Sequence, residues 1–138
     1  MDYQVDLDPT HRVLRLTVRS AVITLECAED CYVCLSQITS QGGDYAAIYD
    51  LSAATNTTIS TEMIRIYAHR APSIPLGRTH VVVGKQPVIY GLVRIFQMCR
   101  EYLGDKFEVV HSLEDAYDIV GARPEDFTER LFPKDLAA

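Results

Sequence analysis

The segment from Asp44 to Thr61 constrains the fold of this chain more than any other. It reads DYAAIYDLSAATNTTIST, in which an apolar run ends at Asp50-Leu51-Ser52 and a polar loop leads to hydroxyl residues where a helix is expected to begin. A buried strand of an open α/β sheet delivers its carboxyl end in this way, to the edge where ligands and partners usually bind. The segment therefore predicts an α/β fold, but no particular reaction.

The rest of the chain alternates between strand patterns and helix patterns. Tyr3–Leu7 and Val13–Val18 alternate in polarity around the turn Asp8-Pro9-Thr10-His11 and predict a hairpin. Further patterns predict strands over 45–50, 79–84 and 107–110, and helices between Thr24 and Gly42, over 60–70, between Pro87 and Gly104, and over 113–120. The order β-β-α-β-α-β-α-β-α predicts a mainly parallel mixed sheet with an antiparallel N-terminal edge strand and flanking helices.

The length is that of one domain, because 138 residues bury about two-thirds of the surface that the unfolded chain exposes. We expect a single domain over 1–138, with its core at about 3–121 and a C-terminal tail at 122–138. Residues 124–138 are expected to form one more helical turn or a tail packed by Phe127, Leu131 and Phe132.

Charge and hydropathy exclude several classes of partner. The net charge of −6, with no local cluster of Lys and Arg, argues against nucleic acid. The acidic N-terminus differs from a signal peptide, and no apolar run approaches the roughly 20 residues of a membrane span. We therefore expect a cytoplasmic protein without stable membrane insertion, whose four cysteines are thiols.

The order of elements, with Asp50-Leu51-Ser52 at a strand exit, resembles the SpoIIAA-like superfamily of STAS domains and small STAS/Sec14-type bacterial proteins. Four phrases are similar to the second branch: Ala68–Pro72, Val81–Gly84, Tyr90–Phe96 and Ser112–Ala116. The resemblance extends from about Val13 to Gly121. It implies the fold given above and a binding role without catalysis.

Anti-sigma-factor antagonists of this superfamily carry an Asp-Ser pair, with the serine phosphorylated, at the start of the helix after the Asp-Leu-Ser strand exit. The matching region here reads Thr57-Thr58-Ile59-Ser60-Thr61 and lacks the acidic residue. If the resemblance extends to a phosphoswitch, Ser60 is its phosphosite. The alternative is that Ser60 is a helix N-cap, which is a common place for serine.

Cys27, Cys31 and Cys34 have the C-x3-C-x2-C spacing of an iron–sulfur ligand set. They also lie at i, i+4 and i+7 of a predicted helix, which is the spacing of one inward stripe. Buried cysteine packs as a small hydrophobe, so we predict core packing. The four histidines show no metal-ligand spacing, and we predict no metal and no cofactor.

Polar residues are expected at the carboxyl ends of the inner strands, on one rim of the sheet. The predicted binding rim consists of Asp50, Ser52, Thr57, Thr58, Ser60, Lys85, Gln86 and His111, with Ser112 beside it. The turn Gly84-Lys85-Gln86-Pro87 is either an anion site at a helix N-terminus or a solvated turn. An enzyme would use Asp50 with His111 or Lys85, but no catalytic triad is recognisable.

Tyr67 and Tyr90 are expected on or beside the second and third helices, where they either seal the core or line an apolar pocket. The leading hypothesis is a non-enzymatic domain that binds a protein partner or a small ligand at the rim. The alternative is a carrier or sensor of a lipid-like molecule, which requires an apolar cavity of several hundred Å³, an order of magnitude typical of ligand sites. A homodimer formed through helices is a further prediction.

Overall fold

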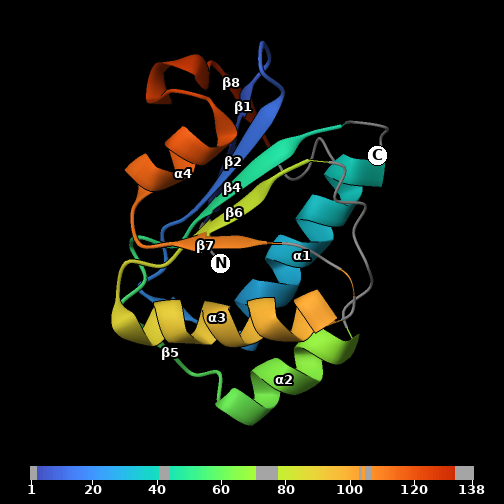
Figure 1. Ribbon diagram of the computed structural model, residues 1–138, viewed down its shortest axis with the longest axis vertical. Coiled ribbons are helices and arrows are strands. Elements are labelled where there is room, and N and C mark those ends of the chain that lie inside the picture. The colour runs from blue at the N-terminus through green and yellow to red at the C-terminus, as the bar shows by residue number, and fades with distance from the viewer. Residues whose placement is uncertain (1–2, 41–43, 71–77, 103, 105–106, 133–138) are drawn as a thin grey trace.

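The computed structural model describes residues 3–40, 44–70, 78–102, 104 and 107–132 (Figure 1). The strands are β1 (Tyr3–Asp8), β2 (Val13–Val18), β3 (Val22–Ile23), β4 (Ala46–Asp50), β5 (Asn56–Thr57), β6 (His80–Val83), β7 (Glu108–Val110) and β8 (Glu129–Leu131). The helices are α1 (Leu25–Ser40), α2 (Thr61–Arg70), α3 (Pro87–Tyr102), α4 (Leu113–Val120) and the short 3-10 helix η1 (Pro124–Asp126). The predicted strands and four helices are confirmed, with bounds that shift by one or two residues.

The main sheet has six strands in the order β7-β6-β4-β2-β1-β8. β2, β4, β6 and β7 are parallel, whereas β1 is antiparallel to both β2 and β8. The mixed, mostly parallel sheet with antiparallel N-terminal strands at one side is thus confirmed. β8 adds three residues outside β1, in a segment expected to be a helical turn or a tail. β3 and β5 form a second, two-stranded sheet that the sequence patterns did not predict.

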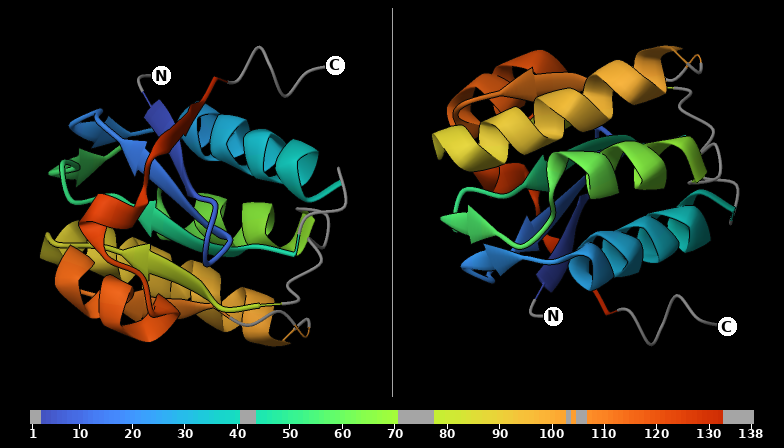
Figure 2. Two further views of the ribbon diagram at one scale, coloured as in Figure 1. Left: turned by 90° about the horizontal axis from the view of Figure 1, so that it is seen from above. Right: turned by 90° about the horizontal axis from the view of Figure 1, so that it is seen from below.

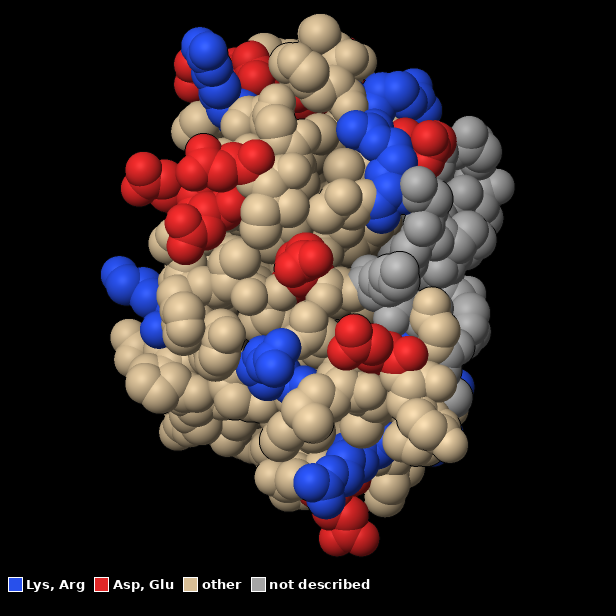
Figure 3. All heavy atoms as spheres, in the orientation of Figure 1, with Lys and Arg blue, Asp and Glu red and all other residues tan. Residues whose placement is uncertain are grey.

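Helices cover both faces of the sheet. α1, α2 and α3 lie side by side on one face, and α4 and the C-terminal segment lie on the other (Figure 2). Because strand residues alternate between faces, Leu14 and Leu16 pack under the three helices while Val13 packs under α4. On the face drawn in Figure 3, acidic side chains gather over α4, which carries Glu114 and Asp115 in its first turn.

Polar contacts fasten the C-terminal segment to β1 and β2. The buried carboxylate of Asp6 accepts hydrogen bonds from Arg15 at 3.2 Å and from Arg130 at 3.3 Å. Arg15 also donates to the Tyr117 hydroxyl at 2.6 Å, and its guanidinium lies 4.5 Å from the centre of the Phe127 ring. Burial by itself lowers the pKa of Arg15, but the interactions with Tyr117 and Asp6 outweigh burial and raise the pKa overall, so the guanidinium stays charged.

Short local signals define where the helices begin. Thr24 accepts from the Cys27 amide, Ser60 from the Met63 amide and Ser112 from the Asp115 amide, each at 3.1 Å. These are N-cap bonds, so the N-cap alternative for Ser60 is confirmed, and Thr24 and Ser112 act in the same way. At the other end of α4, Gly121 takes a positive φ of 73°, the C-cap conformation that favours glycine. Among the described residues, no helix is long and apolar enough to cross a membrane.

Candidate functional site

A pocket lies between the sheet and the three helices on its first face. Its volume is about 150 Å³, and its walls come from β2, β4 and β6 on one side and from α1, α2 and α3 on the other. The aliphatic part of the lining includes Leu16, Val18, Ile64, Val82 and Leu92. None of the described lining residues carries a charged side chain. The pocket is therefore an apolar space between the sheet and the helices α1, α2 and α3.

Aromatic rings form much of the pocket wall, and each contacts the next. Tyr32 of α1 meets Tyr67 of α2 edge to face, with ring centres 6.1 Å apart. Tyr67 stacks on Phe96 of α3 at 6.2 Å, and Phe96 meets Phe107 at 5.8 Å. These separations fall in the range of favourable aromatic pairs. Rings from three helices and from the segment before β7 thus surround the same space.

Tyr49, which lines the pocket, pairs with the buried His80. The Tyr49 hydroxyl lies 2.5 Å from Nδ1 of His80, the rings stack at 5.8 Å, and His80 also meets Phe107 at 6.3 Å. Burial lowers the pKa of His80 to about 4, against a smaller opposing effect of a hydrogen bond with the Tyr45 main chain. Burial also raises the pKa of Tyr49 well above its usual value. Both groups are therefore neutral at physiological pH.

Two cysteines of the α1 stripe, Cys27 and Cys31, line the pocket. Cys27 and Cys34 are buried, Cys31 is half-buried, and all are thiols, as is Cys99. Burial, with smaller contributions from Cys27, Cys34 and Asp30, raises the pKa of Cys31 to about 12. The predicted inward stripe is confirmed. Because the raised pKa keeps the Cys31 thiol protonated, this cysteine is a weak nucleophile in the apolar pocket wall.

The structure separates the two tyrosines that were predicted to share a pocket. Tyr67 lies in the pocket wall, and burial raises its pKa. Tyr90 is not among the described lining residues; its ring stacks on His111 with centres 3.8 Å apart and an angle of 14°. The sequence left open whether Tyr90 seals the core or lines a pocket. In α3 the neighbouring Ile89 is the buried residue, and it belongs to the core cluster beneath the three helices.

Local turn contacts hold the first part of the predicted rim. Asp50, the last residue of β4, is buried and accepts hydrogen bonds from the Ser52 amide at 2.9 Å and from the Ser52 hydroxyl. The Leu51 amide donates to the Val83 carbonyl, which places the exits of β4 and β6 next to each other. Asp50 and Ser52 thus stabilise the turn that follows the strand.

Two hydroxyl residues of the rim, Thr57 and Ser60, are also engaged in structural hydrogen bonds. Thr57 of β5 donates to the Ile23 carbonyl at 2.8 Å and accepts from the Ile59 amide at 3.0 Å. Ser60 is exposed and caps α2, and Thr58 is exposed between them. The N-cap interpretation of Ser60 is confirmed, while phosphorylation of this exposed hydroxyl stays a prediction.

The second part of the rim follows β6 and β7. Lys85 is exposed and Gln86 half-buried in the turn before α3, where the Gln86 carbonyl accepts from the Tyr90 amide. The Gly84 amide donates to the Val110 carbonyl, which brings this turn beside the exit of β7 and His111. Within the described part of the chain, no hydrogen bond joins Asp50 to Lys85 or His111.

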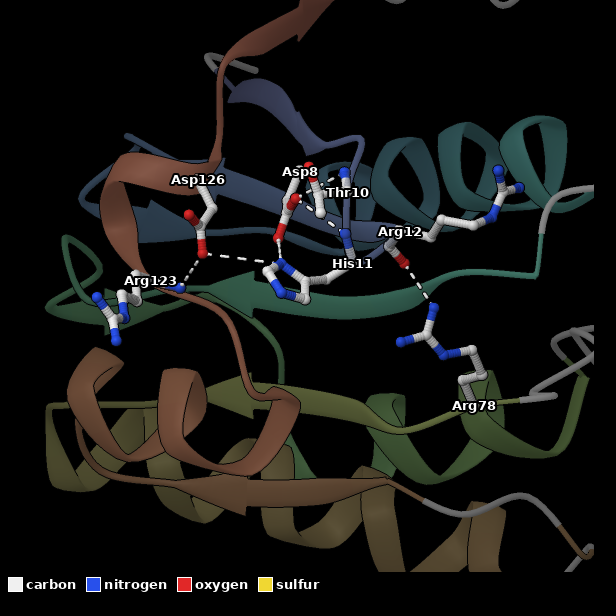
Figure 4. Close-up of polar contacts among 7 residues, drawn as sticks. All are labelled: Asp8, Thr10, His11, Arg12, Arg78, Arg123 and Asp126. Carbon is white, nitrogen blue, oxygen red and sulfur yellow. Dashed lines mark hydrogen bonds and ion pairs between the residues drawn. The ribbon is translucent and has the colours of Figure 1, made fainter.

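A cluster that the sequence did not predict lies at the opposite edge, in the turn between β1 and β2 (Figure 4). Asp8 Oδ2 lies 2.7 Å from His11 Nδ1, which is 3.8 Å from Asp126 Oδ2 of η1. One ligand atom from each residue lies within 4.8 Å of the others, so these three could hold a metal ion. Asp8 and His11 lie close together in the sequence, in the Asp8-Pro9-Thr10-His11 turn, whereas Asp126 joins them only through the tertiary fold.

Searches against protein-family models, curated proteins and solved structures found no match for the chain. What the fold defines is an α/β domain with a six-stranded mixed sheet, four α-helices in its described part and an apolar pocket beneath three of them.

Proposed function

We propose that this protein binds a small apolar molecule in the pocket between the sheet and α1, α2 and α3. The observation that carries the proposal is the pocket itself, about 150 Å³ with a lining of aliphatic and aromatic side chains. A well-packed domain leaves few voids larger than a water molecule, so a space of this size among apolar groups is a natural binding site. The role is that of a carrier or sensor.

The volume limits the size of the ligand. Sites for drug-sized or lipid-like molecules span roughly 300–1,000 Å³. An apolar cavity of about 150 Å³ in another protein binds benzene. We therefore narrow the lipid carrier expected from the Sec14-type resemblance to a carrier of a compact molecule of about one ring.

The pocket supports binding rather than a reaction. Its described lining has no charged group, and the Cys31 thiol, with a pKa raised to about 12, remains protonated and weakly nucleophilic. Protein binding at the rim stays a prediction. Asp50, Thr57 and Ser60 make local turn and cap bonds, which leaves exposed Lys85 and Thr58 as the groups best able to contact a partner.

An NMR titration with toluene tests the proposal. In ¹⁵N-labelled protein, toluene is expected to shift the amides of pocket residues in a saturable manner. Ala28 lies in the α1 wall, so Ala28→Leu fills the pocket and should abolish these shifts. Ala53→Leu, at an exposed loop position, is the matched control and should leave them unchanged. Absence of saturable binding, or equal binding by the Ala28→Leu variant, would refute the proposal.

A further inference from the structure

The pocket has walls that differ from those of an ordinary aliphatic cavity, and this bears on its ligand. Resting on the function proposed above, we infer that the pocket selects a neutral aromatic ring over an aliphatic molecule of the same size and over charged aromatic molecules. Two independent features of the wall, its rings and its lack of charge, carry this inference.

The rings are arranged in a chain around the pocket rather than scattered through it. Tyr32, Tyr67, Phe96 and Phe107 contact one another in that order, at 5.8–6.2 Å between ring centres. The ring of His80, which is not among the described lining residues, contacts both Phe107 and Tyr49 and so links Tyr49 to this chain of rings. A planar guest ring can therefore stack on one of these rings and meet the edge of another. Such contacts add about 0.5–1.5 kcal/mol beyond simple burial, a preference of two- to tenfold.

None of the described residues that line the pocket carries a charged side chain that could compensate an ionic ligand. The described lining residues are aliphatic, aromatic or cysteine, and His80 behind them is neutral because burial lowers its pKa to about 4. Tyrosine and phenylalanine faces attract cations by about 0.5–2 kcal/mol, which is less than the cost of burying a primary ammonium group without an opposite charge. A carboxylate or ammonium group would enter the pocket without an opposite charge. The ligand is therefore neutral.

Phenol and cyclohexanol provide a matched pair of probes, because each has six ring carbons and one hydroxyl. Titrations of ¹⁵N-labelled protein followed by NMR are expected to give a dissociation constant for phenol two- to tenfold lower than for cyclohexanol. Benzoate and benzylammonium are expected to bind at least tenfold more weakly than neutral benzyl alcohol. Equal affinities within either comparison would overturn the corresponding half of the inference.

A variant pair locates the selectivity in the wall. Phe96→Leu keeps an apolar side chain but removes a ring that stacks on Tyr67, so the preference for phenol over cyclohexanol should fall toward unity. Tyr90→Leu removes a ring that stacks on His111 outside the described lining, so the preference should persist. If Phe96→Leu leaves the preference intact, or Tyr90→Leu removes it, the aromatic wall is not its source and the inference is wrong.

These results separate the two proposals. Saturable binding of both alcohols with equal affinity would leave the pocket as a binding site and overturn only its aromatic selectivity. Absence of binding by toluene and both alcohols would overturn the pocket as a functional site, and the inference with it. A phenol preference that Ala28→Leu abolishes and Ala53→Leu retains would support both.

Discussion

Replacing Asp8 by asparagine measures what one buried carboxylate contributes to the turn between β1 and β2. The Asp8 side chain is fully buried at the end of β1. Its Oδ1 accepts hydrogen bonds from the Thr10 amide at 2.9 Å and the His11 amide at 3.1 Å, and its Oδ2 lies 2.7 Å from His11 Nδ1. Asn preserves the shape and one acceptor oxygen but removes the charge. The comparison therefore isolates the electrostatic part of these bonds.

The magnitude follows from the type of bond that is lost. Hydrogen bonds to a charged acceptor contribute about 1.5–3 kcal/mol, against about 0.5–1.5 kcal/mol for neutral pairs, so each amide bond weakens by about 1 kcal/mol. The His11 side chain is 46% exposed, so solvent screening leaves its ion pair about 0–1 kcal/mol. We expect Asp8→Asn to lower the free energy of unfolding by about 2 kcal/mol at pH 7, and Tm by about 6 °C.

The pH dependence has a definite sign. Burial by itself raises the pKa of Asp8, but the bonds from the His11 amide, the His11 ring and the Thr10 amide together hold that pKa below its ordinary value of 3.8. The ionised carboxylate therefore stabilises the fold fully above the unfolded pKa. This stabilisation is lost as the pH falls through the lowered folded value. The stability difference between wild type and Asp8→Asn should shrink below about pH 4.

Urea unfolding followed by circular dichroism at pH 7, 5 and 3 provides the test. The exposed Asp118 of α4 supplies the control, because Asp118→Asn should change stability by less than about 0.5 kcal/mol at each pH. A difference for Asp8→Asn that is under about 0.5 kcal/mol at pH 7, or as large at pH 3 as at pH 7, would refute the reasoning.

Two further substitutions probe how α3 is seated. A Cβ added at Gly84, in the turn before α3, would lie 3.0 Å from the Tyr90 Cα and 3.1 Å from the Tyr90 nitrogen, so Gly84→Ala should lower the free energy of unfolding by about 1–3 kcal/mol in thermal unfolding. Gly91 lies in α3 with open space around it, so Gly91→Ala should raise the free energy of unfolding by about 0.5–1 kcal/mol. Changes of the same sign for both variants would contradict this reasoning. Arg100 is 1% exposed and donates to the Ala68 carbonyl at 2.9 Å. Arg100→Met should lower stability by about 1–3 kcal/mol because the carbonyl loses this bond, and an unchanged Tm would show that the bond contributes little.

Local signals were sufficient for the hairpin strands β1 and β2, the inner strands β4, β6 and β7 and the four α-helices, but not for β3, β5 and β8. Thr24, Ser60 and Ser112 mark helix starts through bonds to amides three residues ahead, and such bonds depend only on nearby sequence. The Cys27–Cys34 stripe was predictable for the same reason, because helical periodicity is a local property. The parallel order of the inner strands followed from the alternation of strands and helices.

Sequence reasoning about the site was less complete, because it followed strand ends rather than the space between layers. It predicted a binding rim at the strand exits, where Asp50, Thr57 and Ser60 make turn, strand and cap bonds. It included Tyr67 in a pocket but added Tyr90, which stacks on His111 instead. Which side of a helix faces a void depends on how neighbouring helices pack, and no local pattern carries that information.

The sequence by itself determined an α/β domain with four helices and inner parallel strands, because periodicity and capping act over a few residues. Only the tertiary structure decided the rest. It added β8 beside β1 and brought Asp126 to His11, since these contacts join segments far apart in the chain. It also assembled the pocket from Tyr32, Tyr67 and Phe96, whose rings meet only because three helices pack on one face of the sheet.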